Sequence, residues 1–192
     1  MAFRGAEAAL EVVVLDTSVL FPAPLCDTLL RAARRGLYRA RWSADILAEL
    51  QGNLIEDRGL NQAQARHRID EMQAAFPEAT VIDYRGLVGA MTNHPKDRHV
   101  LAAAVVADAD TIVTSNLRHF PAEALHPYDV RAVSPDAFLS DLFDREPEVI
   151  LDVLREQAAA LRKPPRTMED VLASLAPLVP HFHSSVVVST TL

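Results

Sequence analysis

The chain has 192 residues, of which 49% are apolar and 23% charged, and a net charge of −7 at neutral pH. This is the size and composition of one globular core with room for an appendage, and the acidic balance argues against a protein that coats nucleic acid nonspecifically. The single cysteine, Cys26, excludes an internal disulfide framework, and the sequence has neither an apolar run of membrane-spanning length nor an uncharged leader, so we expect a cytoplasmic protein with no membrane contact.

The first predicted element is a strand over residues 12–15, VVVL, which runs directly into Asp16. A stretch that is apolar on every side is typical of a strand buried on both faces of a parallel sheet. Ligands bind outside the carboxyl ends of such strands, which makes Asp16 a candidate functional residue. The plainer alternative is that Asp16 only begins a turn through Thr17 and Ser18.

A helix is expected over residues 27–36, ended by Gly36, and a second one follows Ser43 as its N-cap. Between them, RAARRGLYRARW interleaves five arginines with Tyr38 and Trp42. Arginine forks suit phosphates and aromatic rings stack on bases, so the segment could contact RNA. The alternative is a solvated helix face with Trp42 in the core.

The rest of the chain alternates strands and helices. We expect a helix over 61–75, a short strand at 81–82, a helix beginning at Asp97, a strand over 111–114, a strand over 128–133 and a helix over 136–143 capped by Ser134. This order predicts an α/β domain with a parallel sheet over residues 1–144. Residues 145–192 are expected to form a helical extension, with helices over 149–162 and 168–179 and a strand at 186–188.

Two further acids occupy unusual positions. Asp97 leads the apolar face of its helix, and a carboxylate there must be capped, paired or bound to a metal. The alternative for Asp97 is an N-cap. Glu49 flanks the apolar stripe of the helix after Ser43, where a solvated glutamate is the alternative. Right-handed crossovers bring at least the groups at strand ends to one edge of a sheet. Each acid has a plain alternative, but the joint placement of Asp16, Glu49 and Asp97 after the first strand, on the next helix and at the start of a later helix is harder to dismiss.

Four segments in this order, VVLDTSVLF, WSADILAEL, HPKDRHVLAAAV and DTIVTSNLRHF, resemble the PIN domain, and in particular the nucleases that include VapC-type toxins. The resemblance covers about residues 10–142. It implies a three-layer α/β/α sandwich whose acids hold Mg²⁺ or Mn²⁺ and cleave RNA, with a protein antitoxin as partner. Asp16, Glu49 and Asp97 match the first three acids of the family. Asn116 stands where many members have a fourth aspartate, a departure that weakens metal binding.

These residues receive distinct roles under the resemblance. Asp16, Asp97 and Glu49 are the expected metal ligands, and Asn116 completes the catalytic group. Ser18 and Thr114 are expected to orient the carboxylates, although turn hydroxyls are the alternative. RNA phosphates are expected at a set of arginines: Arg34, Arg35, Arg39, Arg98 and Arg118. His94 and His99 lie beside the acids, but an oxygen-rich, sulfur-free site disfavours zinc.

Three alternatives remain open at this stage. A haloacid-dehalogenase-like phosphatase also begins with a strand and an aspartate, but its second acid would fall at Ser18. A PIN-like module without metal could bind RNA or protein, which Asn116 favours and the retained acids oppose. The apolar stripes of the extension could dock on the core, on a second copy in a homodimer, or on the antitoxin.

Overall fold

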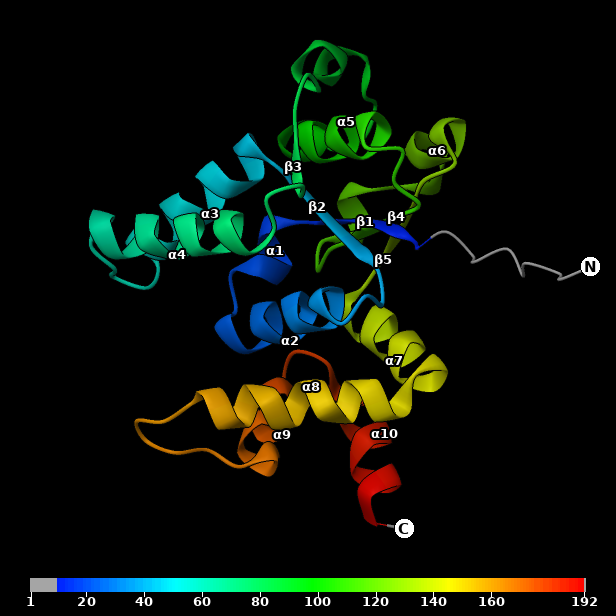
Figure 1. The fold of residues 1–192 in the computed structure, drawn as a ribbon. Coiled ribbons are helices and arrows are strands. Elements are labelled where there is room, and N and C mark those ends of the chain that lie inside the picture. Colours follow the sequence, from blue (N-terminus) through cyan, green and yellow to red (C-terminus); the bar gives the residue numbers. More distant parts are fainter. Residues whose placement is uncertain (1–9, 192) are drawn as a thin grey trace, which may run out of the picture.

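The centre of the molecule is a five-stranded parallel sheet, seen in a computed structural model that describes residues 10–191 (Figure 1). Its strands are β1 (Val12–Leu15), β2 (Arg39–Ser43), β3 (Thr80–Val81), β4 (Thr111–Val113) and β5 (Arg131–Val133), in the order β3-β2-β1-β4-β5. The chain builds outward from β1 on one side and then returns to build on the other. The strand order therefore reverses between β1 and β4, where open α/β sheets bind ligands.

The α-helices of the described residues flank the sheet or pack on the helices that flank it. They are α1 (Thr17–Leu20), α2 (Ala23–Arg34), α3 (Ala44–Glu56), α4 (Gln62–Ala75), α5 (Arg98–Val106), α6 (Ala122–Leu125), α7 (Pro135–Arg145), α8 (Pro147–Ala160), α9 (Met168–Leu175) and α10 (Pro180–Thr191). Short 3₁₀ turns occupy Arg85–Ala90, Pro95–Asp97, Leu117–His119 and His126–Tyr128. Helix α5 lies on one side of the sheet, and α2 and α7 on the other (Figure 1). The predicted three-layer sandwich with a helical C-terminal region is confirmed, and none of the described helices is long and apolar enough to cross a membrane.

The C-terminal helices pack on this chain's own core. Helix α8 lies against α2 (Figure 1). Its residues Ile150 and Leu154 are fully buried. A buried hydrogen-bond chain crosses the same interface, because Thr28 Oγ1 donates to Gln157 Oε1 at 2.7 Å and Gln157 Nε2 donates to the Pro24 carbonyl at 2.9 Å. These contacts are what the core-packing alternative for the extension expects.

Strand β2 was missed by the sequence prediction. Its arginines suggested a solvated surface, but Ala40 and Trp42 alternate with Arg39 and Arg41 and point into the core. Tyr38, just before the strand, is also buried. The idea that Tyr38 and Trp42 stack on RNA bases is therefore wrong, because neither ring is accessible.

The predicted strand at residues 186–188 is also wrong, since this segment lies in α10. Asp136 accepts hydrogen bonds from the amides of His181 and Phe182, at 3.1 and 2.8 Å, and so caps the helix from α7. Phe182 and Val186 are four residues apart and both fully buried, which is the spacing of one helix face. Tertiary packing has overridden the strand preference of a Val-Val-Val run.

Candidate active site

Asp16 lies directly after β1 with its side chain enclosed in the protein. The residue is 3% exposed, and its Oδ2 accepts hydrogen bonds from Ser18 Oγ and Thr114 Oγ1, both at 2.7 Å. Burial raises the pKa of this carboxyl more than the two hydroxyls lower it, and the charge of Asp97 raises it further. Within residues 10–191 no arginine, lysine or histidine forms an ion pair with Asp16. A buried carboxylate without a cationic partner favours the binding of an external cation.

The two hydroxyls that hold Asp16 also join the ends of β1 and β4. Ser18 Oγ accepts the amide hydrogen of Ser115 at 3.0 Å, and Thr114 Oγ1 accepts that of Asn116 at 3.0 Å. Ser18 and Thr114 thus both contact Asp16 and also accept from backbone amides nearby, and Asn116 lies on the same connection. The two hydrogen bonds to Oδ2 therefore fix the orientation of the Asp16 carboxylate.

Glu49 projects from α3 and is held at both carboxylate oxygens. Thr17 Oγ1 donates to its Oε2 at 3.0 Å, and His99 Nε2 lies 3.0 Å from its Oε1. Burial raises the pKa of Glu49, but the hydrogen bond and charge of His99 and the bond from Thr17 outweigh burial, so the net pKa is lowered. Burial lowers the pKa of His99, but its pairing with Glu49 outweighs that and raises it. The sequence prediction had His99 near the acids without assigning this partner.

Asp97 occupies the N-cap position of α5, as the alternative expected, but its side chain makes no hydrogen bond to the helix amides. Its Oδ2 instead lies 2.5 Å from Nδ1 of His119. The His119 ring stacks on that of His94, with centroids 4.0 Å apart and planes 13° from parallel. His119 belongs to the short turn that follows Asn116 after β4, so Asp97 contacts the same segment that carries Asn116.

The acids share one edge of the sheet without forming a closed carboxylate cluster. In the described part of the chain, the three side chains whose ligand atoms lie within 4.8 Å of one another are His94, Asp97 and His119. Asp16 and Glu49 stand outside that group, although the charge of Asp97 acts on Asp16. Mg²⁺ is usually held by one or two carboxylates while water and substrate phosphate supply the remaining ligands, and these acids fit that pattern.

The five predicted RNA-contacting arginines divide between two ends of the molecule. Arg98 and Arg118 flank Asp97 and Asn116, with Arg98 Nε donating to the Asn93 carbonyl at 3.4 Å and Arg118 exposed. The other three lie away from the acids. Because β1 and β2 are parallel, Arg39 at the start of β2 lies at the amino ends of the strands, whereas Asp16 follows the carboxyl end of β1.

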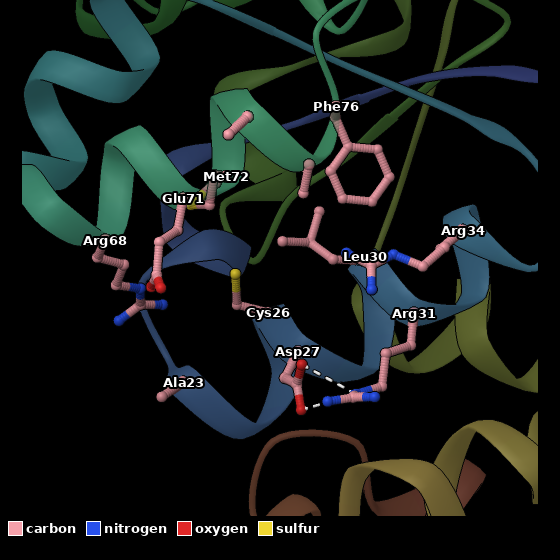
Figure 2. A pocket seen from close by; sticks show the side chains of 12 residues that line it. Ala23, Cys26, Asp27, Leu30, Arg31, Arg34, Arg68, Glu71, Met72 and Phe76 are labelled. Atoms are coloured by element: carbon pink, nitrogen blue, oxygen red, sulfur yellow. Dashed lines mark hydrogen bonds and ion pairs between the residues drawn. The ribbon is translucent and has the colours of Figure 1, made fainter. Parts of the chain in front are cut away.

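Arg34 and Arg35 end helix α2, and Arg35 pairs with Glu156 of α8. Arg34 lines a groove of about 790 Å³ between α2 and α4 (Figure 2). Its walls combine apolar side chains such as Leu30 and Phe76 with further arginines such as Arg68. None of the predicted catalytic acids lines this groove.

Comparison with known families agrees with this geometry. A PIN-domain family model matches residues 12–118, more than half of the chain and the whole segment that contains the acids. The chain belongs to the PIN-domain family. A second family model, the VapC50 C-terminal domain, matches residues 135–186, from α7 into α10. The predicted resemblance to VapC-type PIN proteins with a helical C-terminal region is thereby confirmed.

One curated relative extends this PIN assignment. The protein named "Putative ribonuclease VapC50" from Mycobacterium tuberculosis (strain ATCC 25618 / H37Rv) is 46% identical over 104 residues, which is 54% of this chain. The aligned segment spans 62% of that relative's length. Over this segment the chain is similar to that VapC protein, and it spans less than two thirds of the relative's length.

Proposed function

We propose that this chain is a metal-dependent endoribonuclease and the toxin of a bacterial type II toxin–antitoxin pair. The observation that carries the proposal is the placement of Asp16. It is a buried carboxylate at the strand-order reversal of a PIN-domain sheet, and no cationic side chain of residues 10–191 neutralises it. The similarity to a protein named as a ribonuclease adds the substrate class.

Asp16, Asp97 and Glu49 would hold the ion, and Asn116 would offer a neutral carbonyl oxygen. When bound, Mg²⁺ or Mn²⁺ lowers the pKa of a coordinated water and offsets charge on the phosphodiester. Ser18 and Thr114 fix Asp16 through its Oδ2, while Thr17 and His99 fix Glu49. Arg98 and Arg118 lie close enough in the chain to these acids to attract the RNA backbone.

The test is cleavage of RNA by the purified chain. We expect cleavage with Mg²⁺ or Mn²⁺ and none after chelation by EDTA. A protein that binds RNA with equal affinity with and without metal, and never cleaves it, would instead be a PIN-like binding module, the alternative that Asn116 favours. Membership of the PIN family leaves the haloacid-dehalogenase alternative without support.

The antitoxin is the second part of the proposal. The groove between α2 and α4 is lined by apolar side chains, by three arginines and by the acids Asp27 and Glu71, with Arg31 already paired to Asp27. Its apolar part suits the apolar face of an amphipathic helix. Co-expression with the product of the adjacent reading frame should abolish cleavage. Replacing Leu30 and Phe76 by glutamate should restore cleavage in the presence of that partner if the groove is the binding surface.

A further inference from the structure

The carboxylate of Asp97 is oriented by a single side chain. Its backbone is held firmly, since its amide donates to the His94 carbonyl at 2.9 Å and its own carbonyl accepts from Asn93 Nδ2 at 3.0 Å. The carboxylate itself makes no bond to the helix amides. In the described structure its side-chain partner is His119, through Nδ1 and Oδ2 at 2.5 Å.

His119 is itself fixed from two directions. Its amide donates to the Asn116 carbonyl at 2.8 Å, and its carbonyl accepts from the His94 amide at 3.1 Å. The His94 ring covers one face of the His119 ring. The loop before α5 and the turn after β4 are therefore joined both by backbone and by stacked rings.

The same stacking argues against a metal held by both histidines. A nitrogen lone pair lies in its ring plane, and the two planes are 13° from parallel with centroids 4.0 Å apart. An ion about 2.1 Å from a nitrogen of each ring would lie well outside both planes. Moreover, an ionised carboxylate only accepts hydrogen bonds, so His119 Nδ1 facing Asp97 carries the proton and is not free to bind a metal.

We propose that His119 is a positioning residue for Asp97, and that His94 supports it by stacking. His119 occupies Oδ2 and leaves Oδ1 of Asp97 for the divalent ion. Hydrogen bonds to metal-ligating side chains fix their direction, and removing such partners typically weakens metal binding about 10–100-fold. This inference rests on the proposed function, because it requires Asp97 to be a metal ligand.

The experiment measures Mn²⁺ binding to the full chain by calorimetry. We expect His119→Ala to weaken binding about tenfold or more. His119→Asn should restore it, because the asparagine amide nitrogen, like Nδ1, is three bonds from Cα and can donate to Oδ2. His119→Phe keeps a stacking ring without the donor and should behave like His119→Ala, which covers the case in which His119→Ala does not fold. The matched control is His67→Ala on α4, whose side chain is 73% exposed and which should bind Mn²⁺ as the parent does.

His94 is tested by ring retention. His94→Phe should bind Mn²⁺ nearly as the parent does, whereas His94→Ala should lose affinity in the same direction as His119→Ala but to a smaller extent. Unchanged affinity in both His119→Ala and His119→Phe would overturn the inference. So would nitrogen coupling in the electron paramagnetic resonance of bound Mn²⁺ that disappears in His119→Asn, because His119 would then be a direct ligand. If the parent chain binds no Mn²⁺ at all, the metal-dependent function itself fails, which is a distinguishable result.

Discussion

Acids lie at both ends of the strands of the sheet, and their hydrogen-bond partners differ between the two ends. At the amino end, Glu11 Oε1 accepts from Arg131 Nη2 at 2.9 Å and from Thr111 Oγ1 at 2.5 Å, and Asp110 Oδ2 accepts from the Val12 amide at 2.8 Å. At the carboxyl end, the side chains of residues 10–191 that donate to Asp16 are both hydroxyls.

The difference separates structural acids from candidate functional ones. An arginine beside a carboxylate neutralises it permanently and lends stability to the fold. Hydroxyl and imidazole donors orient a carboxylate without such a permanent charge, so the site keeps its attraction for a divalent ion. The partner of an acid therefore says more about its role than its burial does.

The largest predicted effect is a difference in RNA cleavage rate between substitutions of acids at the two ends of the strands. Asp16→Asn and Asp97→Asn should each lower the RNA cleavage rate by roughly a thousandfold or more, because each removes a ligand of the activating ion. Glu11→Gln should leave the rate within about twofold. The rates are compared by single-turnover cleavage at saturating Mn²⁺. An equal loss of cleavage rate in all three variants would contradict the division into functional and structural acids.

Stability should show the opposite ranking. Glu11→Gln weakens the charged bonds to Arg131 and Thr111 and should cost about 1–2 kcal/mol, at the low end for charged hydrogen bonds because the Arg131 side chain is 62% exposed. For a chain of this size that is a fall in Tm of about 2–8 °C. The measurement is the Tm of the metal-free proteins. An unchanged Tm would show that the bonds of Glu11 to Arg131 and Thr111 do not stabilise the fold.

Asp16→Asn should raise the stability of the metal-free protein at neutral pH. The pKa of Asp16 is raised in the folded state, chiefly by burial, so folding stability is lost as pH rises from the unfolded value of 3.8 through the folded one, and stays lost above it. The gain in Tm should therefore be present at pH 7 and vanish below the unfolded pKa, where Asp16 is protonated in both states. Added Mn²⁺ should reverse the order at pH 7, since only the aspartate binds the ion. A destabilised variant at pH 7 would contradict the assignment of Asp16 as an unneutralised buried acid.

The smallest predicted effect concerns Asn116. Its backbone is fixed by Thr114 Oγ1, and an added carboxylate at this position should strengthen Mn²⁺ binding by about a few-fold, because hard cations favour charged oxygen ligands. Calorimetry on Asn116→Asp tests this. Weaker or equal binding would place residue 116 outside the coordination sphere.

The sequence predicted the parts of this site that depend on local pattern. The buried run into Asp16 and the polar residues after residues 111–113 mark two strand ends, and parallel topology brings them together. The pairing of Asp97 with His119 could not be foreseen in this way, because it depends on the path of a short turn and on a ring stack between segments 25 residues apart in the chain. Likewise, the helix at Phe182 exists because Asp136 caps it from another element, and no local propensity contains that contact.

The docking of α8 on α2 has a consequence for synthesis. Gln157 bonds both the Thr28 hydroxyl and the Pro24 carbonyl of α2, and it is translated after all five strands of the sheet. Translation proceeds at about 5–20 residues per second, so the face of α2 that α8 will cover stays exposed to water for several seconds after α2 has been translated. The contact between α2 and α8 therefore cannot form until about residue 157 has emerged, after all five strands of the sheet.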